Sequence, residues 1–345
     1  MRITLARPDL ALLGRQWRAL EQRANPSFFQ SWTWLGCQVE ARFDNPVLLT
    51  ATEESETVAL GLFNRRRRTL WLHETGDPGL DAPFIERNGL LIAHGHAHRL
   101  PELLRALPGQ LVMAGVDETT ARAAQAGRVV VSLQTRAAPV LDLQRVLLDT
   151  ISSNARAQLR RTMRRYEQRG PLSVRRAGHT AEALTMLRDL VALHATRWQR
   201  RGLPGAFADP RTLAFHQALI ERGVDRDEVD LLRIDAGPRL VGLLYNLRRG
   251  SNVFAYQGGF DFGDAAVQEA SSQLKPGLVC HALAAEWYRG RGLQSYDFGA
   301  GDARYKRSLS SRADTMQWLT LAPRWSPAAG AALLRRGLTQ IRRVS

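Results

Sequence analysis

The order of the predicted secondary structure elements restricts the possible folds of this chain more than any other property. In the first half, apolar residues at helical spacing predict helices over 10–23 and 28–43. Strand-like runs follow at 47–52 and 57–63, separated by an acidic turn. A helical stretch over 97–107 comes after these strands and precedes further strand-like runs at 110–116, 128–133 and 139–143. The first half therefore reads as helices, then a meander, then a helix and further strands.

The second half follows the same plan. Helices over 180–202 and 211–222 precede three strand-like runs, which are 229–235, 239–248 and 252–260. A helix is then expected from Pro276 to about Arg289, because proline favours the first helical position and Gly290 favours an end. Strands over 294–298 and 316–321 complete the series. The pattern predicts an α/β or α+β fold with mixed central sheets flanked by helices.

The length of 345 residues suggests two domains, since domains commonly have about 100–200 residues. The boundary is placed before a basic helix that starts near Ser152 and ends at Gly170-Pro171. We therefore predict an N-terminal domain over 1–148, a C-terminal domain over 149–322 and a basic amphipathic tail over 323–345.

Composition excludes several classes of protein. Apolar residues make up 44% of the chain, which is too many for a disordered protein. Two cysteines, Cys37 and Cys280, supply neither a disulfide framework nor a four-cysteine zinc site. No apolar run is long enough to span a bilayer, and charges interrupt the N-terminal segment where a signal peptide would be apolar. A cytoplasmic protein is expected.

The basic residues are almost all arginine. Lys275 and Lys306 are the only lysines among 48 Lys and Arg residues, and the formal net charge is +15. Arginine is a planar, permanently charged fork, whereas lysine is a compact charge whose pKa can shift. A chain that uses arginine almost everywhere directs attention to the two positions where it keeps lysine.

The segment between the two lysines, Leu274–Lys306, carries a family resemblance. Its features are Pro276-Gly277, the helix end at Gly290–Gly292, the strand Tyr296-Asp297-Phe298, and Gly301-Asp302 shortly before Tyr305-Lys306. This order resembles the BioF2-like group of GNAT acyltransferases, which includes CelD-type proteins of polysaccharide biosynthesis. The group is similar in turn to the FemAB aminoacyltransferases, which carry two GNAT-like domains.

Other stretches extend the resemblance over about residues 25–320. They are Leu193-His194 with Arg197-Trp198 and Gly202, the basic helix from Asn154 to Arg161, Phe29–Trp34, and Val140–Leu143. The resemblance implies two tandem GNAT-like (acyl-CoA N-acyltransferase) domains. It implies that the co-substrate is an acyl-CoA, namely acetyl-CoA. It also implies that the acceptor is a sugar, a polysaccharide or a cell-envelope precursor. No metal is required.

The predicted donor site departs from the usual GNAT pattern. The stretch Gln268–Gly277 lacks the Q/R-x-x-G-x-G/A spacing that binds pyrophosphate. A helix N-terminus beside Lys275 still suits phosphate, so Lys275, Gly277 and Gln273 are the donor-binding candidates. The alternative is that Pro-Gly only starts a helix. The donor stays open between acyl-CoA and aminoacyl-tRNA, the substrate of FemAB proteins.

Three residues are candidates for catalysis. Asp297, at the end of a strand, suits a base that deprotonates an attacking amine or hydroxyl, although an aspartate there also caps turns. Lys306 suits stabilisation of developing charge, although its spacing from Asp302 equally fits a surface ion pair. Tyr256 could protonate a leaving thiolate, or it is simply a core aromatic residue.

The acceptor pocket is predicted at His194, Arg197, Trp198 and Tyr305. His194 and Trp198 share a helix face, so packing of that helix is the competing explanation. His94, His96 and His98 alternate, but a solvated loop explains them better than a metal site. Asp77 and Asp81 are weaker candidates for a cleft between the domains.

The arginine-rich surface supports a rival hypothesis of another class, a non-catalytic protein that binds nucleic acid or a membrane surface. The six arginines between Arg156 and Arg169 could neutralise phosphates or form a solvated face. In the tail, Leu334, Leu338 and Ile341 recur at helical spacing beside arginines. This pattern fits a helix on the inner face of an anionic membrane, and equally a helix that covers the core.

Overall fold

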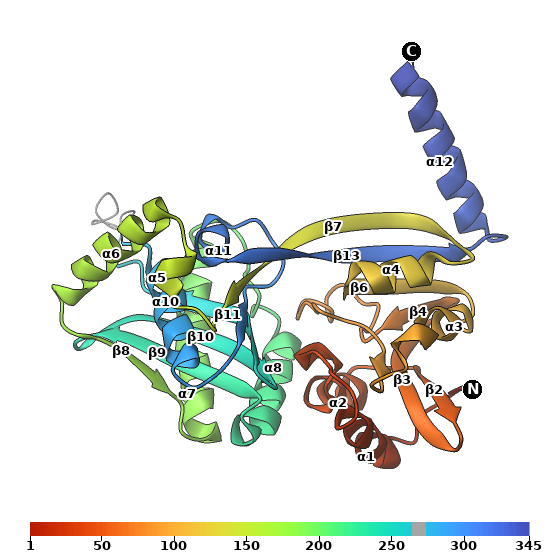
Figure 1. The fold of residues 1–345 in the computed structure, drawn as a ribbon, viewed down its shortest axis with the longest axis horizontal. Coiled ribbons are helices and arrows are strands. Elements are labelled where there is room, and N and C mark those ends of the chain that lie inside the picture. The colour runs from red at the N-terminus through yellow and green to blue at the C-terminus, as the bar shows by residue number, and fades with distance from the viewer. Residues whose placement is uncertain (264–273, 345) are drawn as a thin grey trace. The chain divides into compact units, whose positions relative to one another are not determined.

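The computed structural model describes residues 1–263 and 274–344, with side chains as far as residue 335. The chain divides into two compact units (Figure 1). The first unit comprises Met1–Arg136 and Thr315–Ser345, and the second comprises Ala137–Asp314. Observed and predicted boundaries differ because the chain crosses between the units inside two strands, β7 (Arg128–Asp142) and β13 (Arg312–Pro323). The strands predicted over 128–133 and 139–143 are one continuous strand.

The first unit contains a mixed sheet with the strand order β1-β2-β3-β4-β6-β13, and β5 pairs with β3. Only β4 and β6 pair in parallel among these described strands. The strands not yet delimited are β1 Arg2–Ala6, β2 Pro46–Glu53, β3 Glu56–Arg66, β4 Thr69–Leu72, β5 Leu91–Ile92 and β6 Gln110–Val116. The helices are α1 Leu10–Glu21, α2 Trp32–Ala41, α3 Leu100–Arg105, α4 Glu118–Gln125 and α12 Pro327–Val344.

Local sequence explains where the first helices begin. The Asp9 side chain accepts a hydrogen bond from the Ala11 backbone N–H and caps α1, and Ser31 caps α2 in the same way through Trp34. Strand β3 is buried over most of its length, and its Phe63 joins a core with side chains from β2, β6, α3 and β13. Burial of this apolar surface provides the main stabilisation of the unit.

The second unit contains a mixed sheet with the strand order β7-β12-β11-β10-β9-β8. Strands β11 and β12 are parallel, and the other described neighbours are antiparallel. The strands are β8 Leu172–Arg176, β9 Val229–Ala236, β10 Arg239–Arg249, β11 Asn252–Phe260 and β12 Ser295–Asp297. The helices are α5 Leu147–Thr150, α6 Ser153–Glu167, α7 Thr180–Gln199, α8 Pro210–Gly223, α10 Pro276–Arg289 and α11 Arg304–Leu309.

Helices α7 and α10 cover opposite faces of this sheet. A Cβ atom on Gly242 of β10 would lie 3.0 Å from the Cys280 Sγ of α10. A Cβ on Gly259 of β11 would lie 2.7 Å from the Leu190 carbonyl oxygen of α7. The two glycines project to opposite faces, because Gly259 pairs with Leu243, the neighbour of Gly242. The two glycines therefore allow both helices to pack closely against the sheet.

Candidate active site

Strand β11 extends beyond its parallel pairing with β12 and ends at Phe260, beside Gly277 in the first turn of α10. The pairing of the two strands runs from Asn252 opposite Ser295 to Phe254 opposite Asp297, where β12 ends. Strand β11 continues to Phe260, so its last residues extend beyond the final pair with β12. Ligands of α/β sheets commonly bind beyond the carboxyl ends of parallel strands. The local topology therefore directs attention to the end of β11 and the start of α10.

A pocket of about 260 Å³ lies at the start of α10. Residues from four helices line it, including Gln158 of α6, Arg197 of α7, Gly277 of α10 and Tyr305 of α11. The remaining lining residues are Phe260, Phe262, Lys275, Pro276, Leu278, Arg304 and Ser308. The lining includes three cations, Arg197, Lys275 and Arg304, and no carboxylate among these described residues. Its charge suits an anionic ligand. We call it the donor pocket.

Lys275 occupies an unusual backbone conformation at the entrance to α10. Its φ of 38° and ψ of 60° lie in the left-handed region, which costs a residue with a Cβ about 1–2 kcal/mol relative to glycine. Burial lowers the pKa of the Lys275 ammonium, and the nearby Arg304 and Arg161 lower it further. A cation held in a strained conformation among other cations is a feature typical of functional sites.

The helix start itself offers few backbone donors. Pro276 has no N–H, and the N–H groups of Leu278 and Val279 already donate to the Lys275 carbonyl oxygen at 3.0 and 3.4 Å. Gly277 leaves the pocket open, since a Cβ there would lie 3.4 Å from the Phe260 ring. Phosphate binding at this position would therefore depend on side-chain cations more than on the helix terminus predicted from the sequence.

Tyr305 forms one wall of the pocket by stacking on a buried histidine. The rings of Tyr305 and His281 are 5.0 Å apart with an interplanar angle of 9°, and His281 Nδ1 shares a 2.9 Å hydrogen bond with the Tyr296 hydroxyl. Burial and then the Lys306 charge lower the pKa of His281 to about 3. Burial raises the pKa of Tyr305 to about 12. The histidine is neutral and the phenol keeps its proton at neutral pH.

Asp297 and Lys306 lie beside this wall. Asp297 is 4% exposed, and its carboxylate accepts a 2.8 Å hydrogen bond from the Gly299 N–H. The Lys306 ammonium donates to the carbonyl oxygens of Gly299 and Ala300 at 3.3 and 2.8 Å. Both side chains thus hold the turn that follows β12, and neither lines the donor pocket.

A second, more basic pocket adjoins the donor pocket. It has a volume of about 500 Å³ and shares Arg197, Phe260 and Phe262 with its neighbour. Its other lining residues are Arg169, Leu193, Thr196, Arg200, Arg239, Asp261, Gly263 and Leu274. The Arg197 guanidinium lies 4.8 Å from the centre of the Phe262 ring, between the two hollows. With four arginines against one aspartate, the charge of this arginine pocket suits an anionic group.

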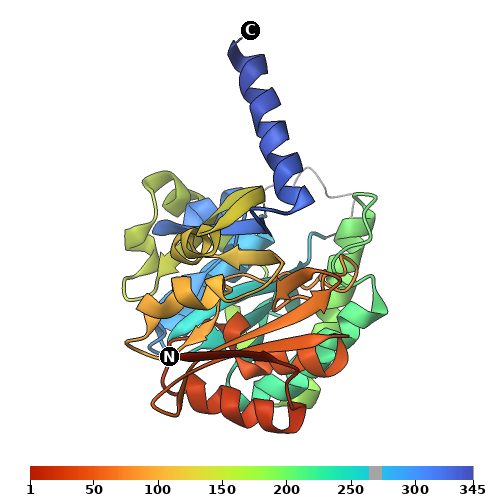
Figure 2. The same cartoon turned by 90° about the vertical axis from the view of Figure 1, so that its right-hand side faces the viewer.

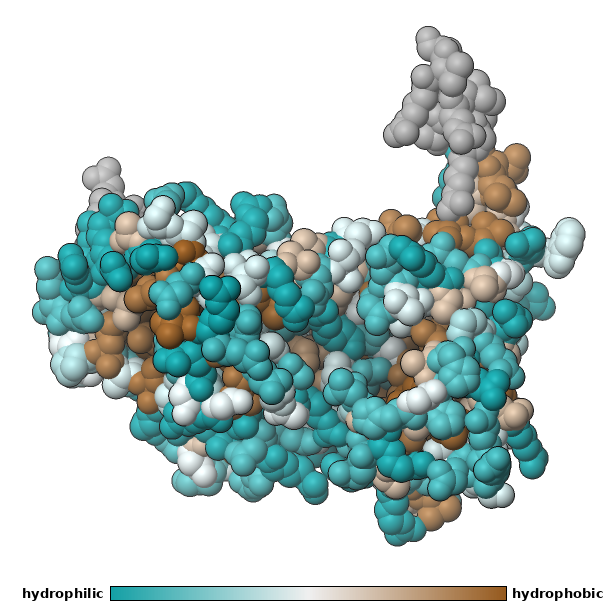
Figure 3. Space-filling view, in the orientation of Figure 1, coloured by the Kyte–Doolittle hydropathy of each residue, from teal (hydrophilic) through white to brown (hydrophobic). Residues whose placement is uncertain are grey.

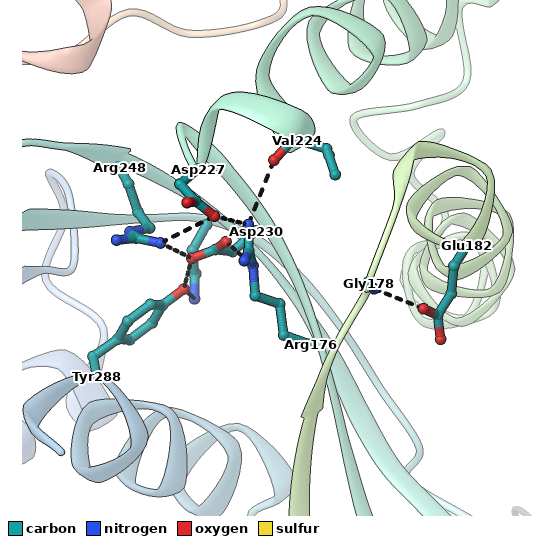
Figure 4. A network of polar contacts seen from close by, with 9 residues as sticks. Arg176, Gly178, Glu182, Val224, Asp227, Asp230, Arg248 and Tyr288 are labelled. Atoms are coloured by element: carbon teal, nitrogen blue, oxygen red, sulfur yellow. Dashed lines mark hydrogen bonds and ion pairs between the residues drawn. The ribbon is translucent and has the colours of Figure 1, made fainter. Parts of the chain in front are cut away.

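A buried polar network holds α10 on the sheet (Figure 4). The Tyr288 hydroxyl of α10 donates to the fully buried Asp230 carboxylate of β9 at 2.9 Å. Arg176 of β8 contacts the same carboxylate at 2.5 Å, and Arg248 of β10 lies at 3.6 Å. Asn246 donates to the Tyr288 hydroxyl at 3.2 Å. The network orients the helix whose first residues form the donor pocket.

The structure brings together only some of the residues predicted from the sequence. Lys275, Gly277, Arg197 and Tyr305 line the donor pocket, and Gln273 lies outside the described residues.

Three further candidates lie elsewhere. Tyr256 is 6% exposed and packs with the rings of His216 and Tyr245 at 5.6 and 5.7 Å. His194 packs between Trp198 and Phe207, and burial followed by Arg197 lowers its pKa to about 4. Neither His194 nor Trp198 lines the two pockets.

Sequence analysis missed His281 and the arginines at 169, 200, 239 and 304 as members of one site. His281 follows Gly277 by four residues on a predicted helix, so helical spacing contained a signal for it. The arginines come from segments far apart in the sequence, and no spacing connects them. Among the described residues, no group of histidines, cysteines and carboxylates has the arrangement required to hold a metal ion.

Comparisons with known proteins agree with this geometry. Residues 153–307 match the family model of the acetyltransferase (GNAT) domain, so the second unit carries a GNAT-type domain. The match includes all residues that line the two pockets except Ser308. No curated protein matches the chain.

Solved structures extend the likeness to the whole chain. A crystal structure of FemX aligns with a TM-score of 0.58 at 10% identity, over 92% of this chain and 96% of that one. The C-terminal domain of a putative lysylphosphatidylglycerol synthetase from Agrobacterium fabrum aligns with a TM-score of 0.56 at 11% identity, over 94% and 95%. L-PGS from Bacillus licheniformis aligns with a TM-score of 0.54 at 11% identity, over 93% and 95%. These likenesses confirm the predicted fold class.

Proposed function

We propose that the protein is an acyltransferase that moves an acyl group, acetyl in the simplest case, from acyl-CoA to an amine or hydroxyl group. The acceptor would be a sugar, polysaccharide or cell-envelope precursor. The observation that carries the proposal is the donor pocket, where three cations converge at the start of α10 in the GNAT-type domain. The resemblance to BioF2-like and CelD-type proteins suggests the acceptor class. We further propose that each predicted half is a GNAT-like domain.

The pocket residues fit a donor that carries phosphates. Lys275 and Arg304 would bind its phosphate oxygens, and Gly277 would leave room for the chain that links phosphate to the acyl group. Charge-assisted hydrogen bonds of this kind are stronger than neutral ones. Phe260 and Phe262 would exclude water from the bound chain.

Tyr305 is the residue of the pocket best suited to move a proton. A bound thioester supplies an activated carbonyl carbon, to which the amine or hydroxyl forms a bond while the carbon–sulfur bond breaks. The Tyr305 hydroxyl, protonated at neutral pH, would donate its proton to the departing sulfur. Solvent water would take the proton from the attacking group and return one to the phenolate. Atoms and charges then balance as amide or ester plus free thiol.

Asp297 and Lys306, predicted from the sequence as the base and the charge-stabilising group, would instead contribute indirectly. Both hold the turn at Gly299 and Ala300 that precedes α11. This turn positions Tyr305 on the same short helix. Arg197, shared by both pockets, is the strongest candidate among the predicted acceptor-binding residues. His194 and Trp198 would support its helix.

An aminoacyl-tRNA donor is the second candidate. The arginine pocket favours it, because a nucleic acid end presents more phosphates than the donor pocket has cations to bind. Helix α6 adds Arg160, Arg161 and Arg164 on exposed positions. The structural neighbours named FemX and lysylphosphatidylglycerol synthetase are consistent with this donor.

The decisive experiment supplies the purified chain with acetyl-CoA, longer acyl-CoAs or aminoacyl-tRNA, together with a panel of amino sugars. We expect acceptor-dependent release of free thiol, with the acylated sugar identified by mass spectrometry. Lys275→Ala should raise the KM for acyl-CoA, and the matched control Arg122→Ala, at an exposed ion pair of α4, should not. Consumption of aminoacyl-tRNA alone would select the second donor. Salt-sensitive RNA binding without any transfer would contradict both and favour a non-catalytic binding protein.

A further inference from the structure

The last helix of the chain and the residue before it expose large apolar side chains to solvent. Helix α12 extends away from the other elements of the first unit (Figure 1, Figure 2). Trp325, directly before the helix, is 98% exposed, and Leu333 and Leu334 are 53% and 71% exposed. Brown apolar surface covers the described start of the helix (Figure 3). Such side chains remain in contact with water unless a partner covers them.

The start of α12 shows which helix face the protein buries. Ala329 and Ala332 are buried, at 0% and 4% exposure. The Ser326 hydroxyl accepts from the Ala329 N–H at 3.2 Å and donates to the Pro323 carbonyl at 2.8 Å, which fixes the first turn. The helix thus attaches through alanines, whereas Leu334, five residues after Ala329 and two after Ala332, lies on the opposite side of the helix. The described part of α12 does not cover the core with its leucines.

The sequence of the helix pairs this apolar face with positive charge. In the sequence, Leu334, Leu338 and Ile341 recur at intervals of four and three residues, the spacing expected of one apolar helix face. The segment 323–345 contains five arginines, at 324, 335, 336, 342 and 343, and neither aspartate nor glutamate. Among the described residues, no helix combines the length and apolarity needed to cross a bilayer.

We propose that Trp325 and α12 form a surface that binds an anionic phospholipid bilayer, with the helix lying in the plane of the interface. Leucine and isoleucine would enter the boundary between headgroups and acyl chains, and arginines would contact lipid phosphates. Tryptophan is favoured at this boundary because its ring is apolar and its N–H is polar. A second copy of the chain is a poorer occupant, because both surfaces would carry the same positive charge.

The test measures cosedimentation of the full chain with vesicles of equimolar phosphatidylglycerol and phosphatidylcholine, and with vesicles of phosphatidylcholine alone. We expect binding to the anionic vesicles that weakens as salt is raised. Leu334→Gln and Trp325→Ala should each weaken it about tenfold, because each removes one large side chain from the interface. Leu203→Gln, at an exposed leucine of the second unit, is the matched control and should leave binding unchanged.

Two results would overturn this proposal. One is equal binding of the wild type and Leu334→Gln to anionic vesicles. The other is a wild-type protein that does not bind vesicles but forms a concentration-dependent dimer in analytical ultracentrifugation, with the dimer lost in Leu334→Gln. Thiol release from acyl-CoA with a soluble amino sugar, measured on the same variants, is independent of vesicle binding. Failure of the membrane proposal is therefore distinguishable from failure of the proposed acyl transfer.

Discussion

Replacing Lys275 with glycine should stabilise the fold while it weakens donor binding. The backbone at this residue has a φ of 38°, a conformation that costs a non-glycine residue about 1–2 kcal/mol. Glycine removes that cost but gives the unfolded chain more freedom, worth about 0.5–1 kcal/mol. The expected net change is a gain of about 0–1.5 kcal/mol in the free energy of unfolding. For a unit of this size each kcal/mol gained would raise the Tm by about 2–4 °C.

The same substitution removes the ammonium from the donor pocket. A hydrogen bond to a charged group is worth about 1.5–3 kcal/mol, and partial exposure of Lys275 reduces this to about 1 kcal/mol. The dissociation constant for CoA should therefore increase about fivefold. Thermal unfolding and isothermal titration calorimetry measure the two effects on one preparation. The effects are opposite in sign, so a general loss of structure cannot imitate them.

Two further variants separate the backbone from the charge. Lys275→Ala keeps the left-handed conformation and loses the ammonium, so it should bind CoA as weakly as Lys275→Gly without the gain in Tm. Lys275→Arg keeps a cation and should bind CoA within about twofold of the wild type. A Lys275→Gly protein that binds CoA with full affinity would refute the assignment of Lys275 to the donor. A lower Tm would refute the argument from backbone strain.

Three other substitutions test the wall of the pocket and its support. Burial holds the pKa of His281 near 3, below the ordinary value of 6.5, so the unfolded chain binds a proton first as the pH falls. His281 should then contribute about 1.4 kcal/mol per pH unit to the decrease in the free energy of unfolding below pH 6. In denaturant titrations His281→Asn should reduce the slope by that amount and leave the part that comes from His73 and His194, whose pKa values burial also lowers. Tyr305→Phe keeps the stacked ring but lacks the hydroxyl. It should lower kcat for thiol release about 100-fold with little change in KM, and an unchanged kcat would exclude the proton-donor role. Asp230→Asn removes the buried carboxylate from Arg176 and Arg248 and leaves them only the exposed Asp227, which should cost about 3 kcal/mol in chemical unfolding. A loss below about 1 kcal/mol would show that Asp227 and water satisfy both arginines.

The sequence predicted elements well where local chemistry determines their ends. Helix α10 has the predicted bounds because Pro276 favours its first turn and Gly290 ends it. Strands β9, β10 and β11 match closely, since each is rich in apolar residues and turn-forming residues separate them. Strand β1 was missed. Its residues do alternate between polar and apolar, but the run has only five residues, and its place in the sheet depends on long-range pairing with β2.

The site was predicted in part for a similar reason. Lys275, Gly277 and Tyr305 belong to the short stretch between the two lysines, so resemblance and local spacing were enough to find them. Tyr305 and Lys306 are adjacent in the sequence, but neighbours on a helix differ in direction by about 100°, and only the tyrosine lines the pocket. Arg169 and Arg239 reach the arginine pocket through the folding of separate segments. Only the structure could place them there.

The most direct test of the account is a crystal structure of the protein with a thioether analogue of acetyl-CoA, which cannot transfer its acyl group. The account predicts that the pyrophosphate lies within hydrogen-bond distance of the Lys275 ammonium and the Arg304 guanidinium, with the acyl end beside the Tyr305 hydroxyl. Bound analogue whose phosphates lie away from the start of α10 would contradict it.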